Sequence, residues 1–136
     1  TGHVAEVTVD NAGNVRVDRV VAAVDCYHVA NPKLVEAQLE SGIIYGLTAA
    51  LYGEITIENG AVTQGNFDSY PMVTMRDAPD IEVYLSLSGG ENWAGVGECA
   101  TAPIAAAVTN AIFAATGKRV RQLPLKNINL RELAQL

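Results

Sequence analysis

The stretch Gly95-Val96-Gly97-Glu98-Cys99-Ala100-Thr101-Ala102-Pro103 is the part of the sequence around which the rest is organised. Its two glycines let the backbone pass where side chains would obstruct it, and Pro103 suits the first turn of a helix, where a missing N–H costs nothing. The alanine-rich run 104–116 predicts that helix, and Gly117 is well placed to end it. The sequence therefore places a carboxylate, Glu98, on a glycine-flanked turn directly before a helix N-terminus.

The first 25 residues predict a β-hairpin. Residues 4–10 alternate apolar and polar side chains, as a half-buried strand does. A turn over 11–14 follows, and the strand pattern resumes over 15–25. The second strand loses its alternation after Val20, which indicates that it runs into a core.

A long helix is predicted from Pro32 to about Tyr52, with Asn31 as its N-cap. Its first half is amphipathic and is expected to turn three apolar residues inward: Leu34, Val35 and Leu39. Its second half, 42–51, is almost wholly apolar and contains two glycines. This half is therefore expected to be buried and closely packed.

The dipeptide Asn59-Gly60 is the strongest hairpin signal in the chain and predicts a type I′ turn. The flanking segments 54–58 and 61–67 are the expected strands. Residues 68–79 are expected to be irregular, because two prolines interrupt regular structure there.

The last third of the chain predicts a strand over 81–87, a short extended segment over 121–125, and a final helical turn or two over 129–136. The whole order is hairpin, helix, hairpin, strand, helix. This order predicts an α+β (mixed α/β) fold in which helices cover one side of a sheet. With 136 residues and 49% hydrophobic content, the chain is long enough to bury the core of one domain.

Composition and charge exclude several classes of function. A formal charge of −6 argues against a nucleic-acid partner, since a phosphate-binding surface needs concentrated Lys and Arg. No apolar run approaches the roughly 18 residues of a membrane helix. Cys26 and Cys99 lie far apart and outside any CxxC or Cys/His spacing, which argues against a zinc or iron–sulfur site and leaves a disulfide between them open.

Glu98 has several chemical interpretations. A phosphate-cradling loop is disfavoured, because no Gly-Lys-Ser/Thr follows and a glutamate repels phosphate. A hydrolase nucleophile is disfavoured, because the chain has no G-x-S-x-G. A general base in an apolar, glycine-lined pocket suits a carboxylate best, with Trp93, Val96 and Ile104 as expected apolar neighbours. Spacing alone leaves this interpretation level with that of a tight loop carrying a solvated glutamate.

Further motifs occur in order along nearly the whole chain: Asp25-Cys26, Asn31-Pro32, the segments 38–47, 51–56 and 66–71, Gly95 to Glu98, Pro103 to Ala105, and the segments 110–119 and 123–125. Together they resemble the C-terminal part of the molybdopterin-binding subunit in the xanthine dehydrogenase/aldehyde oxidase (molybdenum hydroxylase) family. The segments 51–56 and 66–71 look closest to isoquinoline 1-oxidoreductase β subunits. Cys99 stands where the family usually has proline, and Ser41 where a second glycine is common.

The resemblance implies a role for named residues. Glu98 would be the general base for the hydroxyl that attacks an electron-poor carbon of an aldehyde or N-heterocycle, with the inserted oxygen derived from water. Gln38 would hydrogen-bond the pterin, and Gly95 and Gly97 would bring backbone to the cofactor. The implied cofactor is a molybdenum–pterin group in its cytosine dinucleotide form.

The resemblance also implies partners. The family's molybdenum subunit is several times longer than this chain, so residues 1–136 are expected to be its single C-terminal segment and to be inactive alone. The expected partners are the remainder of that subunit, a subunit carrying iron–sulfur clusters, and a small-molecule substrate. The alternative from another class is a stand-alone α+β domain that binds a partner or ligand without catalysis. The sequence leaves the compartment open between bacterial cytoplasm and periplasm.

Overall fold

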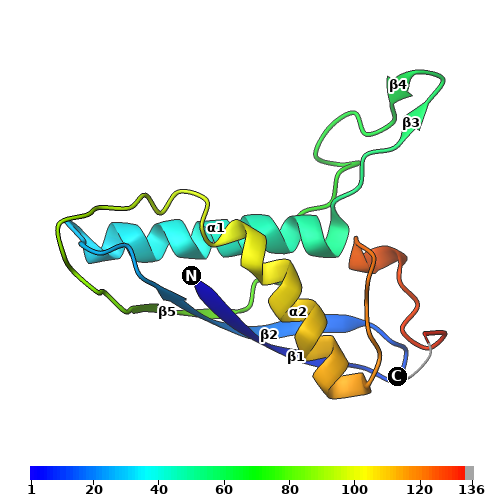
Figure 1. Cartoon of the computed structure of the whole chain (residues 1–136). Coiled ribbons are helices and arrows are strands. Elements are labelled where there is room, and N and C mark those ends of the chain that lie inside the picture. The colour runs from blue at the N-terminus through cyan, green and yellow to red at the C-terminus, as the bar shows by residue number, and fades with distance from the viewer. Residues whose placement is uncertain (134–136) are drawn as a thin grey trace.

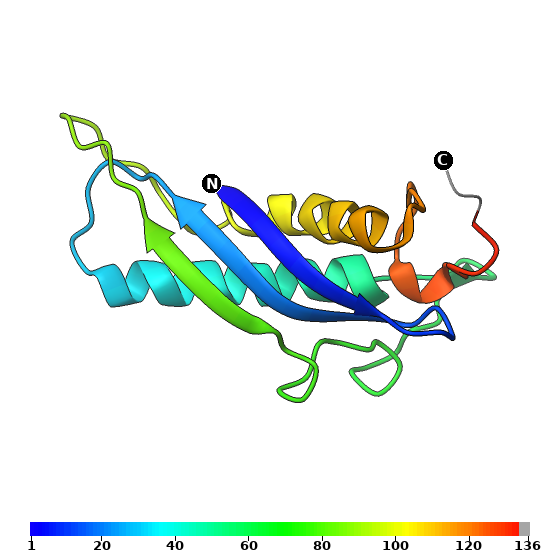
Figure 2. The same cartoon turned by 90° about the horizontal axis from the view of Figure 1, so that it is seen from below.

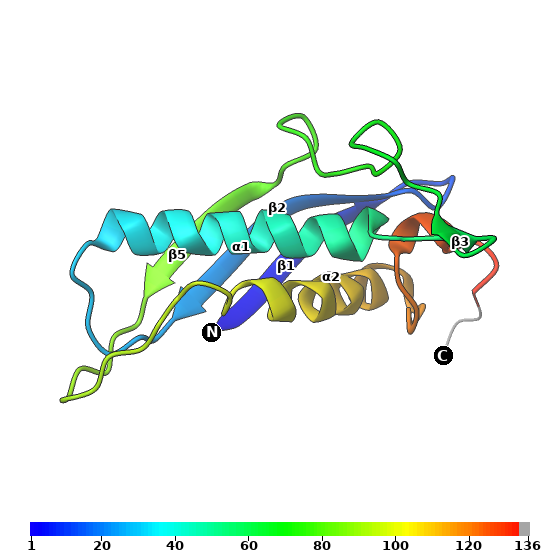
Figure 3. The same cartoon turned by 90° about the horizontal axis from the view of Figure 1, so that it is seen from above.

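The computed structural model describes residues 1–133, which form a sheet covered on one face by two helices (Figure 1). Strands β1 (Gly2–Val9) and β2 (Val15–Val24) pair antiparallel, and β5 (Asp80–Leu85) adds parallel to β2, giving the order β1-β2-β5. Helix α1 (Pro32–Tyr52) lies between β2 and β5 in the chain, and α2 (Thr101–Thr116) comes after β5. Both helices lie on the same face of the sheet, as the views from below and above show (Figures 2 and 3). The predicted α+β class is confirmed.

The first hairpin forms as predicted. Its register pairs Gly2 with Ala23 and Val9 with Val15, and shifts between Glu6 and Val7. The parallel pairing of β2 with β5 needs a long crossover, which α1 supplies. The predicted strand over 81–87 is present but ends at Leu85.

Helix α1 begins as its sequence predicts. The Asn31 side chain accepts a hydrogen bond from Leu34 N, and Pro32 is the first helical residue. The expectation that Leu34 faces inward is wrong, because 64% of this residue is exposed. The buried stripe of α1 runs through Leu39, Ile43 and Leu47. Leu34 precedes Leu39 by five residues and so lies roughly 140° around the helix from that stripe.

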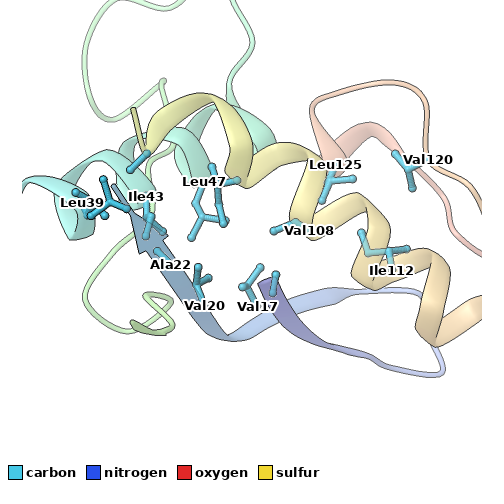
Figure 4. Close-up of a cluster of buried hydrophobic side chains, with 14 of the residues drawn as sticks. Val17, Val20, Ala22, Leu39, Ile43, Leu47, Val108, Ile112, Val120 and Leu125 are labelled. Carbon is cyan, nitrogen blue, oxygen red and sulfur yellow. The ribbon is translucent and has the colours of Figure 1, made fainter. Parts of the chain in front are cut away.

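The core lies between the sheet and the two helices (Figure 4). It is built almost entirely from aliphatic side chains, as the low aromatic content requires. The sheet supplies Val17, Val20 and Ala22, α1 supplies Leu39, Ile43 and Leu47, and α2 supplies Ile104, Val108 and Ile112. Because these side chains interlock from three elements, the core fixes how α1 and α2 lie over the sheet.

The second hairpin has its predicted turn but much shorter strands. Asn59 and Gly60 have φ of 52° and 81°, the positive values that a type I′ turn needs. The strands are only β3 (Ile57–Glu58) and β4 (Ala61–Val62), and all four residues are exposed. With no second layer to pack against, the pairing does not extend over 54–58 and 61–67 as expected.

The C-terminal part differs in detail from its prediction. Helix α2 starts at Thr101, so Pro103 lies in its first turn as predicted, and Gly117, with φ of 69°, ends it as expected. A short 3₁₀ helix, η1 (Leu125–Asn127), precedes the segment 129–136 in which a helical turn was predicted. Residues 130–132 form only a turn, and 134–136 lie outside the described residues. Cys26 and Cys99 are both free thiols, which closes the question of a disulfide.

Candidate functional site

A groove of about 620 Å³ opens where α1 passes the start of α2. It is lined by residues from two segments far apart in the sequence: Gln38, Ser41, Gly42 and Tyr45 from α1, and Gly97, Glu98, Thr101 and Ala102 from the loop and first turn of α2. The two segments lie next to each other in the view from above (Figure 3). The fold thus brings together Gln38, Gly97 and Glu98, three of the four residues that the sequence singled out.

Two glycines on α1 create this close approach. A Cβ on Gly46 would lie 2.5 Å from Ile104 Cγ2 and closer still to the carbonyl oxygen of Thr101. A Cβ on Gly42 would lie 3.0 Å from that of Ala100. Because Gly42 and Gly46 have no side chain, the turn that carries Glu98 rests directly on α1. This explains in physical terms why the apolar half of α1 contains two glycines.

The backbone around Glu98 is held in place while its carboxylate is left free. The Glu98 carbonyl accepts a hydrogen bond from Thr101 N (3.0 Å), and the Cys99 carbonyl accepts one from Thr1 Oγ1 (2.7 Å). A Cβ at Gly95 or at Gly97 would meet nothing within 4 Å, so both positions border open space. Gly97 lines the groove, whereas Gly95 does not.

The expected apolar enclosure of Glu98 is wrong for this chain. Glu98 is exposed. Ile104 is fully buried in the core beneath, and Trp93 is 67% exposed with its ring 5.0 Å from that of His28. Val96 is half-buried against the core, and none of these three residues lines the groove. The missing signal was helical phase, since Ile104 lies on the buried side of α2 together with Val108 and Ile112.

The groove carries a set of unengaged polar side chains. Within residues 1–133, no side-chain hydrogen bond joins Gln38, Ser41, Tyr45, Glu98 or Thr101 to another protein group. An amide, three hydroxyls and a carboxylate offer both donors and acceptors, which is the complement of a polar heterocycle. No group of three or more His, Cys, Asp or Glu in the described part of the chain could hold a metal ion. These residues therefore suit an organic cofactor or ligand rather than direct metal ligation.

Sequence reasoning missed three polar residues of the groove: Ser41, Tyr45 and Thr101. A signal for two of them was available. Ser41 and Tyr45 follow Gln38 by three and seven residues, which places them on the same side of a helix. Thr101 was missed because the helix was expected to begin nearer to Pro103.

Asp25 fixes the segment that leads into the Glu98 turn. Its Oδ1 accepts hydrogen bonds from Tyr27 N (2.9 Å) and from Ser88 N (3.1 Å), so it joins the end of β2 to the loop after β5. These bonds, the one from Tyr27 N above all, lower the pKa of the Asp25 carboxyl. The Ala94 N–H donates to the Cys26 carbonyl (3.3 Å), and His28 Nε2 contacts the carbonyl of Gly90. Hydrogen bonds to Asp25 and Cys26 thus hold the loop 86–95 in position.

Comparison with known proteins places this geometry in a family. The model of the molybdopterin cofactor-binding domain matches residues 1–79, more than half of the chain. The chain belongs to this family. It is 39% identical to the β subunit of isoquinoline 1-oxidoreductase from Brevundimonas diminuta over 124 residues, which cover 90% of this chain and 16% of that protein. It is 37% identical to one of the subunits of nicotinate dehydrogenase from Pseudomonas putida, over 90% of this chain and 10% of that protein.

A solved structure matches nearly the whole chain. Quinoline 2-oxidoreductase from Pseudomonas putida 86 superposes with a TM-score of 0.80 and 26% identity, over 97% of this chain and 18% of that one. The predicted membership in the xanthine dehydrogenase/aldehyde oxidase group is confirmed, and the fold is that of a segment of larger molybdenum-binding subunits. The chain spans less than a fifth of the length of these relatives. Among residues 1–133 no helix has the length and apolar character needed to cross a membrane.

Proposed function

We propose that residues 1–136 are the C-terminal segment of the molybdenum-binding subunit of a hydroxylase, in which Glu98 is the general base. The observation that carries this proposal is the shared groove. Gln38 and Glu98 lie 60 residues apart in the sequence and line one cavity, with free polar groups around them. The family resemblance gives these two residues adjoining roles, and their placement side by side supports those roles.

The residues present fit the pterin part of such a cofactor. The Gln38 amide, with one acceptor and two donors, can pair with the hydrogen-bonding edge of a pterin, and Ser41 and Thr101 add hydroxyls within the same groove. Because Gly97 has no side chain, a ligand in the groove can come close to its backbone. The space beside Gly95 is open as well. When bound, the molybdenum–pterin group, proposed in its cytosine dinucleotide form, supplies the redox chemistry.

The contribution of Glu98 is proton transfer at its carboxylate oxygen. A general base has to reach the proton it accepts at about 2.6–3.2 Å, so the rigid turn that holds the Glu98 backbone serves catalysis by positioning. In this chain the Glu98 side chain is exposed to solvent. Exclusion of water has to come from the remainder of the subunit. The proposal therefore includes that remainder as an obligatory partner and predicts no activity from this chain alone.

The proposed substrate is an N-heterocycle or an aldehyde, oxidised with oxygen from water. The two relatives of highest identity given above and the superposed structure are named for isoquinoline, nicotinate and quinoline, which favours an aromatic N-heterocycle. A separate subunit with iron–sulfur clusters is proposed to take the electrons, because the described residues have no cysteine cluster for such a centre.

The test is Glu98→Gln in the complete enzyme, produced in its natural host and purified from it. We expect molybdenum and pterin content to stay at the wild-type level while kcat falls by about 10²- to 10⁴-fold, the usual loss for a general base. Glu91→Gln is the matched control, since Glu91 is an exposed glutamate seven residues earlier that does not line the groove. If Glu98→Gln kept activity within about twofold of the control, the base assignment would be wrong.

Two further measurements address the cofactor and the length of the protein. Acid release of a cytosine nucleotide from the purified enzyme would support the dinucleotide form, and release of a guanine nucleotide would contradict it. Detection in the cell of a stable, metal-free protein of 14.4 kDa would contradict the whole proposal and favour a stand-alone binding domain.

A further inference from the structure

Residues 53–79, here called the arm, connect the end of α1 to β5, and the hairpin β3–β4 within them projects away from the sheet and helices (Figure 1). No residue of this range is buried. The arm nevertheless holds six of the fourteen exposed large hydrophobic residues found in the described chain: Ile55, Ile57, Val62, Phe67, Met72 and Met75. Phe67 is 79% exposed and Met75 97%. Such a concentration of uncovered apolar side chains marks an interaction surface.

The arm has a defined conformation of its own. The Thr56 N–H donates to Gln64 Oε1 (2.9 Å), Gln64 Nε2 donates to Thr56 Oγ1 (2.8 Å), and the Thr63 N–H donates to the Thr56 carbonyl (3.0 Å). Further along, Ser69 Oγ accepts from Gly65 N (3.0 Å). These bonds join residues close in sequence, so they shape the arm without tying it to the body of the protein.

The arm contacts the body at Glu54 and again from Val73 onward, where Val73 packs against the core. Glu54 pairs with Lys126 Nζ (3.0 Å) and accepts from Asn127 Nδ2 (2.9 Å), which lowers the pKa of the Glu54 carboxyl. At the other end, Val73 N donates to Thr48 Oγ1 (3.2 Å). Between these anchors lies a shallow hollow of about 340 Å³, lined by Ile55, Gln64, Gly65, Asn66, Phe67 and Tyr70. An apolar floor with amide groups beside it suits an inserted apolar side chain from another surface.

We propose that the arm docks onto the remainder of the same molybdenum-binding polypeptide and that Phe67 lies at the centre of this contact. The inference rests on the proposed function, because it requires a longer chain. The family model covers residues 1–79 and so includes the whole arm. The relatives that share 90% of this chain are six to ten times longer than the matched segment. The arm is therefore part of the family's domain, and most of the surface available to cover it belongs to the rest of that polypeptide.

Charge argues against a second copy of the segment as the occupant. The chain carries a net charge of −6, and the arm itself has an excess of acidic residues, with Glu58 and Asp68 exposed near its apolar side chains. Two such surfaces would repel each other. The occupant is expected to be apolar with basic residues at its rim.

The test places a photo-crosslinking amino acid at Phe67, or at Met75, in the complete enzyme, and identifies the crosslinked peptides by mass spectrometry. We expect each position to crosslink to peptides of the same polypeptide outside the 136-residue segment. Crosslinks to the iron–sulfur subunit, crosslinks between differently labelled copies of the enzyme, or an absence of crosslinks at both positions would each overturn the proposal.

A pair of variants measures the energetic weight of the contact. In the complete enzyme, Phe67→Asp is expected to lower the yield of assembled, molybdenum-containing protein at least tenfold, whereas Phe67→Leu keeps it within about twofold. Equal yields from the two variants would contradict docking through an apolar contact. An enzyme that holds molybdenum and depends on Glu98 but shows no arm crosslinks refutes the docking and leaves the proposed function standing.

Discussion

In the body of the protein, α1 and α2 meet over the sheet so closely that two glycines are needed, and seven residues of α1 are buried. In the arm, 53–79, no residue is buried and the same kinds of apolar side chain point to solvent. Both regions are nevertheless well defined. The body is held by packing between distant segments, while the arm is held by a type I′ turn and hydrogen bonds between near neighbours.

This difference indicates what stabilises each part of the molecule. Side chains that pack across three elements stabilise the body. Local hydrogen bonds stabilise the arm only modestly, because each exchanges with water. A region with a fixed shape and an uncovered apolar surface is suited to recognising another surface without a large ordering cost. The groove of Glu98 lies on the packed body, where the contact between α1 and the start of α2 sets the backbone around Glu98.

The largest expected effect on stability comes from truncating a large apolar side chain to alanine, once in the body and once in the arm. Leu47→Ala deletes a fully buried side chain and is expected to lower the free energy of unfolding by about 3 kcal/mol, within the range for buried leucines. Phe67→Ala removes a larger side chain, but it is expected to change the free energy of unfolding by less than about 0.5 kcal/mol, because Phe67 is exposed in this segment. Denaturant unfolding of the segment measures both. Equal losses would abolish the distinction between body and arm.

A smaller effect is expected from adding one methyl group. Gly46→Ala forces α1 away from the Thr101 carbonyl, at a cost of about 3 kcal/mol that a better helix propensity of about 1 kcal/mol partly offsets. The expected net loss is about 2 kcal/mol. Gly65→Ala in the arm is the control, since its Cβ would meet nothing within 4 Å and should leave the melting temperature unchanged. A Gly46→Ala variant as stable as the control would mean that α1 and α2 do not touch at this glycine.

The smallest expected effect depends on pH and concerns His3 in β1. Both ring nitrogens of His3 are buried without a hydrogen-bond partner in residues 1–133, and burial lowers its pKa. The unfolded chain then binds the proton more readily, so stability that is present above about pH 6.5 is lost as the pH falls through this value toward the lower folded pKa. We expect the melting temperature to drop by about one to two degrees between about pH 7.5 and 5.5.

The variant His3→Leu isolates this contribution. It is expected to remove that part of the pH dependence and, because no unsatisfied nitrogen remains, to be at least as stable as the wild type at about pH 7.5. Hydrogen exchange at Thr56 in the arm should not follow the same titration, since the hydrogen bonds between Thr56 and Gln64 join neutral groups. A His3→Leu variant with the full pH dependence of the wild type would show that another group titrates.

Much of the fold was predictable because its signals are local. The Asn31 cap with Pro32, the Asn59-Gly60 turn and the Gly117 stop each act within a few residues, and all three occur where the sequence predicts them. Leu34 was predicted wrongly because the direction of a side chain depends on which stripe of α1 meets the sheet. The strands of the second hairpin were predicted too long because their length depends on a packing layer that the arm lacks.

The candidate site also has features that local sequence predicts and features that depend on tertiary packing. The sequence by itself determined that Glu98 sits on a glycine-flanked turn before a helix, and the order of the motifs indicated the family, because both are properties of neighbouring residues. Only the tertiary structure decided that Gln38, Ser41 and Tyr45 share a groove with Glu98, and that Trp93 and Ile104 do not. The physical reason is the contact at Gly42 and Gly46. Packing of the core brings α1 and α2 together, and only then does the absence of a side chain at these glycines determine how closely the two helices approach.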